Sequence, residues 1–218
     1  MSQTLASETK LPPLAVFLLV AWFSVVAWLA AGDTFAAGPG ELPWKLTLAL
    51  LLPQVLFALA YWAFSGVRDY VLSLSLPLLT GLQAWRMLGA GFLMLWFWDV
   101  LPPLFAFPAA LGDAAVAAAA PFLVAAFFTP NGLSRRRLIV WNWLGVTDFL
   151  IAFSVGFLAS GSAAGLLAAG VTSDPMLRLP LVLIPAFGVP FFTLLHFISF
   201  LQLYRSRQES ITLAPAAA

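Results

Sequence analysis

Six long, largely apolar runs divide this chain, and they constrain its fold more than any other feature. They cover residues 14–31, 46–64, 79–98, 104–128, 138–159 and 181–204. Each has the roughly 17–25 residues that an α-helix needs to cross about 30 Å of hydrocarbon. The runs are continuous rather than alternating, which excludes a transmembrane β-barrel. The sequence therefore predicts an all-α, polytopic integral membrane protein, a helical bundle of about six transmembrane helices.

The composition agrees with lipid as the solvent. Hydrophobic residues make up 62% of the 218 residues and charged residues only 9%, against roughly 45–50% and 25% in soluble domains. A soluble domain of this size could not cover its surface with so few charges. We expect residues 1–211 to form one membrane-embedded domain, and residues 212–218, rich in alanine, to form a disordered tail.

Two segments leave alternatives open. Lys10 and the run from Leu14 to Ala31 resemble a secretory signal sequence. Its 18 apolar residues exceed the usual 7–15 or so, and one cation precedes them, so we expect a retained first helix. Residues 160–171, rich in Gly, Ser and Ala, are too few to cross the membrane; we expect a loop, and the alternative is a segment that re-enters the membrane or lies at its interface.

The cationic side chains predict the orientation of the bundle. With six helices both termini share one side, which holds Lys10, Arg68, Arg135, Arg136, Arg137, Arg205 and Arg207. The opposite side has only Lys45 and Arg178. Short cytoplasmic loops carry the excess of Lys and Arg, so we expect a multi-pass protein of the plasma (inner) membrane with both termini in the cytoplasm.

Four ionisable residues lie inside the apolar runs, on four different helices: Arg86, Asp113, Asp148 and His196. Each costs at least a few kcal/mol to insert into lipid, so such a residue normally faces the interior of the bundle and has a partner or a task. Gln83 lies three residues before Arg86, and Asn142 six residues before Asp148 with Gly145 between them. These spacings predict polar strips on neighbouring helices. We expect these six polar residues to form one internal site for a substrate or for protons.

Depth within each helix refines this prediction. Counted from the cytoplasmic ends, Arg86 lies about 10 Å deep, His196 about 12 Å, Asp148 about 15 Å and Asp113 about 22 Å. We therefore expect Arg86 to pair with Asp148. Asp113 is then left desolvated, which disfavours its charged form and suits a proton carrier. Two other interpretations of Asp113 stay open, a second ligand of Arg86 and a residue that faces a wet outer vestibule.

Pro185, Gly188 and Pro190 interrupt the last run. Each proline removes a backbone hydrogen bond from the helix. Proline is ordinary in membrane helices, so one interpretation is a static kink. The other is a broken helix that lines a cavity or flexes.

The residue inventory excludes several classes of function. His196 is the single histidine and there is no cysteine, so bis-histidine haem, iron–sulfur clusters and Cys-ligated zinc are excluded. Both lysines flank helices, which excludes a buried retinal Schiff base. No Walker-type loop for ATP is present, and a net charge of +1 does not favour nucleic acid as a partner. We expect no cofactor and no metal site.

Three functional hypotheses follow from the polar residues. The first is transport or permeation of a small solute, coupled to protons, through the site of Arg86, Asp113, Asp148 and His196. The second is a structural or assembly subunit of a homo-oligomer or larger membrane complex, in which the charges only join the helices. The third is a membrane enzyme that acts on a lipid-soluble substrate through His196. A Ser/His/Asp hydrolase is formally available from Ser199 or Ser154 with His196 and Asp148, but no G-x-S-x-G motif accompanies these residues.

Overall fold

The computed structural model describes residues 13–38, 40–130 and 132–212, with side chains up to residue 205. Its six membrane-length, apolar helical spans are Pro13–Ala31, Trp44–Ala63, Leu76–Phe97, Pro103–Phe127, Arg135–Leu158 and Ile184–Arg205. These spans confirm the predicted all-α membrane bundle, and each end lies within three residues of its predicted position. Lys10 and the tail beyond residue 212 lie outside the described residues, so the predicted disordered tail stays a prediction.

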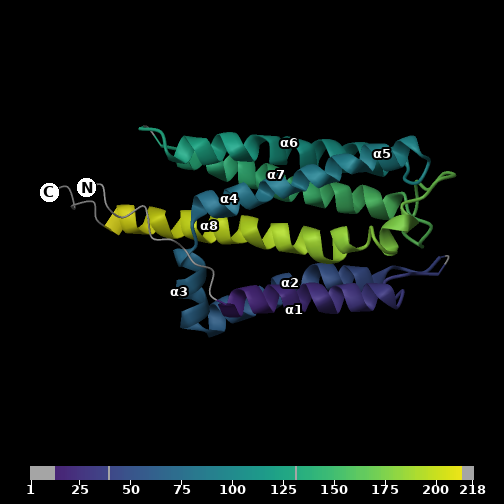
Figure 1. The fold of residues 1–218 in the computed structure, drawn as a ribbon, viewed down its shortest axis with the longest axis horizontal. Coiled ribbons are helices and arrows are strands. Elements are labelled where there is room, and N and C mark those ends of the chain that lie inside the picture. Colours follow the sequence, from purple (N-terminus) through teal and green to yellow (C-terminus); the bar gives the residue numbers. More distant parts are fainter. Residues whose placement is uncertain (1–12, 39, 131, 213–218) are drawn as a thin grey trace.

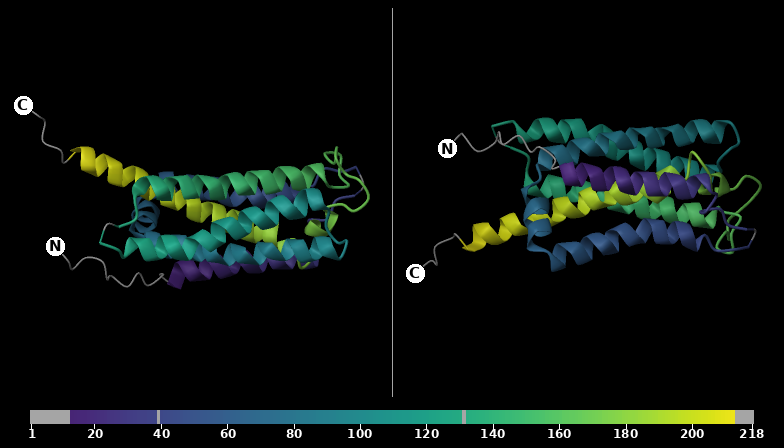
Figure 2. Two further views of the ribbon diagram at one scale, coloured as in Figure 1. Left: turned by 90° about the horizontal axis from the view of Figure 1, so that it is seen from above. Right: turned by 60° about the horizontal axis from the view of Figure 1, so that its bottom comes forward.

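The elements follow one another in the order α1 (Pro13–Ala31), α2 (Trp44–Ala63), α3 (Ser65–Ser73), α4 (Leu76–Leu82), the 3-10 helix η1 (Gln83–Gly91), α5 (Phe92–Phe97), α6 (Pro103–Phe127), α7 (Arg135–Leu158), the 3-10 helix η2 (Asp174–Leu177), the π-helical segment η3 (Ile184–Gly188) and α8 (Val189–Thr212). The long helices run roughly along one axis, and the short α3 lies across them at one end (Figures 1 and 2). We call this end, where α1 begins and α8 ends, the proximal end. The other is the distal end.

Local sequence signals explain several helix starts. Ser75 and Ser134 precede α4 and α7, and each side-chain oxygen accepts a hydrogen bond from a backbone N–H of the first turn, at 3.4 Å in both cases. This is the usual role of serine at a helix N-terminus. Pro103 opens α6, where proline is favoured because the first N–H has no partner within the helix.

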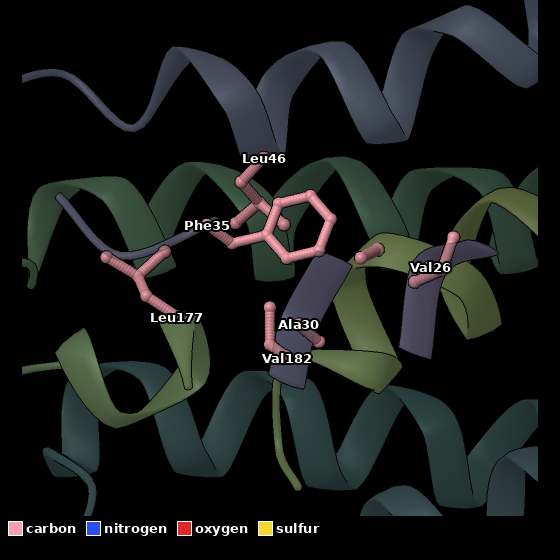
Figure 3. Packing of buried hydrophobic residues seen from close by; sticks show 7 residues of the cluster. Val26, Ala30, Phe35, Leu46, Leu177 and Val182 are labelled. Atoms are coloured by element: carbon pink, nitrogen blue, oxygen red, sulfur yellow. The ribbon is translucent and has the colours of Figure 1, made fainter. Parts of the chain in front are cut away.

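The helices form two groups. The segment α4–η1–α5 packs with α6, α7 and α8, and we call these elements the core bundle. The helices α1 and α2 lie outside the core bundle, where α1 contacts η3 and α2 contacts α8, η3 and α3. Both lie beneath α8 in Figure 1, and Figure 2 shows that they are apart from one another. A buried apolar cluster joins the two groups near the distal end, and Figure 3 shows its members Val26, Ala30, Phe35, Leu46, Leu177 and Val182.

The third span is not a uniform α-helix. Its middle nine residues, Gln83–Gly91, form the 3-10 helix η1. A 3-10 helix has three residues per turn, so side chains three apart lie directly above one another. Thr80, Gln83, Arg86, Gly89 and Phe92 follow this spacing, and all five are buried. Their side chains form a straight row that faces the other spans of the core bundle.

The last span is irregular where the prolines indicated either a static kink or a break. Residues Ile184–Gly188 are π-helical, and the α-helix begins at Val189. Gln54 of α2 donates a hydrogen bond from Nε2 to the carbonyl of Pro190 at 3.0 Å. An interior proline in a membrane helix is tolerated when neighbouring side chains satisfy the backbone groups that it frees. The prolines at 185 and 190 free the carbonyls of Leu181 and Ala186, so the contact from Gln54 does not replace a lost bond but joins α2 to this segment.

The distal loop between α7 and η2 matches the expected loop. Residues 160–171 form turns and one isolated bridge between Ala169 and Val171, with no helix in this stretch. At the opposite end, two of the arginines counted in the orientation prediction donate to backbone carbonyls, one at the end of α2 and one within α8. Arg68 donates to the carbonyls of Tyr61 and Trp62 at the end of α2, and Arg135 donates to the carbonyl of Leu203.

Candidate functional site

Arg86 is the centre of a buried polar cluster between the four spans of the core bundle. Its side chain is only 1% exposed. Nε donates to Oδ1 of Asp113 on α6 at 2.7 Å, and Nη2 donates to Oδ2 of Asp148 on α7. Nη1 lies 3.4 Å from the carbonyl oxygen of Gly145 and 3.1 Å from Nε2 of His196 on α8. One guanidinium therefore joins all four spans of the core bundle.

The contacts of His196 fix its protonation. An arginine Nη1 can only donate, so Nε2 of His196 accepts and carries no proton. On the other side of the ring, Nδ1 lies 2.7 Å from Oδ1 of Asn142. The Asn142 amide is oriented by its Nδ2, which donates to the carbonyl of Leu138 at 2.8 Å, so its oxygen faces the ring as an acceptor. The imidazole is thus neutral with its proton on Nδ1, whereas the sequence suggested a histidine that changes charge near neutral pH.

Three glycines allow the helices to approach around the charges. A Cβ at Gly112 would overlap the carboxylate of Asp148, and one at Gly145 would overlap the His196 ring and lie 3.0 Å from Nη1 of Arg86. A Cβ at Gly89 would lie 2.7 Å from Cβ and Cγ of Asp113. Small residues at helix interfaces let backbones approach closely in membranes. Here each glycine makes room for a charged or polar side chain of another helix.

Aromatic rings enclose the cluster. The guanidinium carbon of Arg86 lies 3.8 Å from the ring centroid of Phe149, a cation–π arrangement. The ring of Trp141 packs edge-on against His196, with centroids 5.6 Å apart, and its Nε1 donates to the carbonyl of Val116 at 3.2 Å. The cluster is therefore held in a fixed geometry by its apolar surroundings as well as by its hydrogen bonds.

A cavity of about 80 Å³ extends from Asp113 to the distal loop. This volume has room for several water molecules. The walls are mostly apolar and come from α6, α7, η3 and the beginning of α2, whereas Ser160, Ser173 and Asp174 line the distal part. The finding agrees with one interpretation that the sequence left open, an Asp113 that faces a vestibule. The last helix is π-helical over Ile184–Gly188 rather than broken, and its residues Ile184, Pro185 and Val189 line the cavity.

Arg86 binds both carboxylates, so the expectation that Asp113 is unpaired was wrong and the alternative, in which Asp113 is a second ligand of Arg86, agrees with the structure. The reason lies in the backbone of the third span. That span begins at Leu76, and the 3-10 helix rises about 2.0 Å per residue instead of 1.5 Å. Arg86 therefore lies about 16 Å into its span, and Asp113 about 21 Å into α6. The difference of roughly 5 Å is within the reach of an arginine side chain.

Gln83 does not join the cluster. Its Nε2 donates to the carbonyl of Phe192 on α8 at 3.1 Å, and its Oε1 is buried without a hydrogen-bond partner. The hydroxyl oxygen of Thr80, one turn closer to the proximal end, is also buried without a hydrogen-bond partner. Thr80 was not predicted as a site residue, although its position three residues before Gln83 places it in the same row of side chains.

A serine hydrolase arrangement is not formed. Both ring nitrogens of His196 are taken by Arg86 and Asn142, and the residue is fully buried. The hydroxyls of Ser154 and Ser199 donate to carbonyls of their own helices. In the part of the chain that the structure describes, no three His, Cys, Asp or Glu side chains gather as metal ligands do.

The model of one protein family, the Domain of unknown function (DUF8737), matches residues 43–204, about three quarters of the chain. The chain belongs to that family. The DUF8737 match begins just before α2 and ends in α8, so it contains every residue of the polar cluster and of the cavity and leaves out α1. No match was found among curated proteins or among solved structures.

Proposed function

We propose that this chain transports a small solute across the membrane in exchange for, or together with, protons bound at the Arg86 cluster. The observation that carries the proposal is the charge of the cluster. Arg86 supplies one positive charge, Asp113 and Asp148 supply two negative charges, and His196 is neutral. A formal charge of −1 in a low-dielectric layer is costly unless a proton or another cation is bound.

The cavity supports the same proposal, because it leads from Asp113 toward the distal loop. A proton or solute that arrives there reaches a carboxylate without crossing a packed region. The π-helical segment η3 forms part of the wall, and π-helical turns inside helices are frequent at functional sites. The cluster closes the cavity on its proximal side, as expected of a site that is open to one side at a time.

The orientation belongs to the proposal. Arg68, Arg135, Arg136 and Arg137 lie at or near the proximal end, and the excess of cations there favours a cytoplasmic proximal end in the plasma membrane. The distal part of the cavity, lined by Ser160, Ser173 and Asp174, then lies toward the outside of the cell. Labelling of single cysteines introduced at Ser65 and at Ser162 with an impermeant maleimide in intact cells tests this, and labelling at residue 65 instead of residue 162 would reverse the orientation.

Proteoliposomes test the transport itself. An enclosed pH dye reports proton movement after a membrane potential or a solute gradient is imposed, and the solutes tested include cations, anions and neutral compounds. We expect proton flux with the wild-type chain and none with Asp113→Asn, which keeps an acceptor for Arg86 but cannot bind a proton. Asp99→Asn is the matched control, because it removes an exposed distal carboxylate whose positive φ asparagine tolerates. Flux that persists in Asp113→Asn, or no flux with any solute, would overturn the proposal.

A structural or assembly subunit is the second candidate, and one observation favours it. Every nitrogen of the Arg86 guanidinium has an acceptor within the chain, as expected of a static link between helices. This candidate predicts that the chain, in native membranes, runs as one complex of fixed size with a stoichiometric partner, and that purified protein carries no proton-linked flux.

A further inference from the structure

The cavity between Asp113 and the distal loop has walls of a particular chemistry. Five phenylalanine side chains line it: Phe92, Phe105, Phe149, Phe153 and Phe157. Three of them lie on one face of α7, at spacings of four residues. Apart from Ser160 and Ser173, the polar side chains among the lining residues are the carboxylates Asp113 and Asp174. The two carboxylates lie at opposite ends of an aromatic passage.

Positive charge is missing from the wall. None of the described residues that line the cavity is Lys, Arg or His. The side chain of Phe149 lines the cavity, and its ring packs against the guanidinium of Arg86, which is not among the lining residues. The half-buried Asp174 accepts a hydrogen bond from the backbone N–H of Gly161 at 2.8 Å. A solute in the cavity therefore meets negative groups and aromatic rings.

These walls discriminate between classes of solute. An anion would meet two carboxylates and no cationic partner. An inorganic cation would lose its water and find few oxygens in return, since hard cations need about six oxygen ligands. A neutral apolar solute would fit the walls but leave the carboxylates unused. A cation that carries its own apolar surface satisfies both features, because ammonium groups are attracted to the faces of aromatic rings.

We propose that this cavity binds a small organic ammonium ion, which is the solute of the transport proposed above, so that this inference rests on the proposed function. The ammonium group lies at the Asp113 end, and its alkyl groups contact the rings of Phe105, Phe149 and Phe153. The charged and titratable groups around Asp113 are Arg86 from η1, Asp148 from α7 and His196 from α8. With the cluster at −1, one ammonium ion or one proton restores neutrality.

The two cations therefore compete for one carboxylate. When the ammonium ion binds, the proton on the carboxyl group leaves to bulk water, and when the ammonium ion leaves, a proton returns. Binding in a weakly buffered solution then acidifies the solution, by up to one proton for each ammonium ion bound. Such competition at a single site is sufficient to couple the movement of the amine in one direction to that of a proton in the other.

The binding test uses purified full-length protein in detergent micelles and titration calorimetry. The probes are tetramethylammonium, choline and phenyltrimethylammonium, and 3,3-dimethylbutan-1-ol serves as the neutral isostere of choline, with carbon in place of nitrogen. We expect at least one ammonium probe to bind with release of protons, and the neutral isostere to bind about tenfold more weakly or worse. No binding of any of the three, or equal binding of choline and its isostere, would overturn the inference.

Two variants locate the site. Asp113→Asn is expected to weaken ammonium binding about tenfold or more and to abolish proton release. Phe153→Leu keeps the apolar wall but removes a ring, and a cation–π contact of about 1 kcal/mol corresponds to roughly fivefold weaker binding. Asp99→Asn should bind like the wild type. If Asp113→Asn does not fold, Phe153→Leu still decides, because unchanged ammonium affinity in that variant would place the ligand elsewhere.

The outcomes separate this inference from the proposed function. Proton flux in proteoliposomes without ammonium binding would leave the transport proposal intact and remove the ammonium ion as its solute. Ammonium binding at Asp113 without any flux would keep the site and remove the transport. Loss of both would favour the structural candidate.

Discussion

The pair of outer helices, α1 and α2, is at least as apolar as the four spans of the core bundle but is held differently. Only 11% of α1 and 6% of α2 are buried within the chain, against 39% for α7 and for the last span. No side chain of α1 makes a hydrogen bond among the described residues, whereas buried polar contacts join all four spans of the core bundle. Hydropathy places a helix in lipid but does not attach it to its neighbours, because lipid tails are as apolar as leucine.

The difference lies in the small and polar residues. Where Gly89, Gly112 and Gly145 face charged or polar side chains, the helices of the core bundle can approach closely. The helices α1 and α2 contain no glycine, and large side chains extend from them into the surroundings, such as Trp28 at 75% and Trp62 at 77% exposed. Mutations should therefore have large effects in the core bundle and small effects in the pair, and the predictions below test this contrast in order of decreasing effect.

The largest effect is expected from Arg86→Leu. It removes the single positive charge and leaves the two carboxylates Asp113 and Asp148 without a partner in a low-dielectric layer. Breaking a buried ion pair in this way costs about 3–5 kcal/mol. Size-exclusion chromatography of a fluorescent fusion measures the folded yield, which should fall severely. A normal monodisperse peak would show that the cluster does not hold the core bundle together.

Replacement of the glycines at the helix contacts should have the second largest effect on stability. In Gly112→Ala the new methyl group overlaps the carboxylate of Asp148, and overpacking of this kind costs about 1–3 kcal/mol. Gly91→Ala is the matched control, since a Cβ at Gly91 meets nothing within 4 Å. Thermal unfolding in detergent should show a clearly lower unfolding midpoint for Gly112→Ala and an unchanged midpoint for Gly91→Ala. Equal effects would mean that the close approach of α6 and α7 is not required.

The two carboxylates should behave as a coupled pair. Asp113→Asn and Asp148→Asn each leave one carboxylate for Arg86, so each single change should cost about 1 kcal/mol. The double variant leaves the guanidinium uncompensated and should cost more than the sum of the two. A double-mutant cycle from unfolding midpoints measures this excess. Strict additivity would argue against a guanidinium shared between α6 and α7.

The smallest effect is expected in the pair. Trp28→Ala on α1 removes a large ring that no other part of the described chain covers closely. Its effect on the unfolding midpoint should lie within about 0.5 kcal/mol of zero, as for most exposed substitutions. Val26→Phe, at the buried cluster of Figure 3, is the contrasting change on the same helix. A large loss of stability in Trp28→Ala would reveal that the exposed face of α1 is covered by something outside this chain.

Part of this architecture follows from the sequence by simple physics. The six spans are set by hydropathy and length, and the cost of a charge in lipid indicated that Arg86, Asp113, Asp148 and His196 share an interior site. The row of Gln83, Arg86 and Gly89 was also visible, as residues three apart.

What the sequence did not predict depends on tertiary packing. Hydropathy does not distinguish a 3-10 helix from an α-helix, so the depth of Arg86 was underestimated, and its contact with Asp113 was only one of the alternatives left open. A cavity was among the alternatives left open, but its walls were not predictable, because they come from segments as distant as Pro43 and Val189. The short helix α3 is amphipathic and lies outside the apolar runs, where a search for membrane spans does not find it.

The 3-10 conformation of η1 gives the third span a length and a twist that an α-helix would not have. Nine residues at about 2.0 Å rise instead of 1.5 Å extend the span by roughly 4–5 Å. At three residues per turn Gln83 and Gly89 point the same way, whereas at 3.6 per turn they would differ by about 120°. A change of η1 between the two helical forms would therefore shorten the span and turn Gln83 and Gly89 away from one another, with Arg86 midway between them.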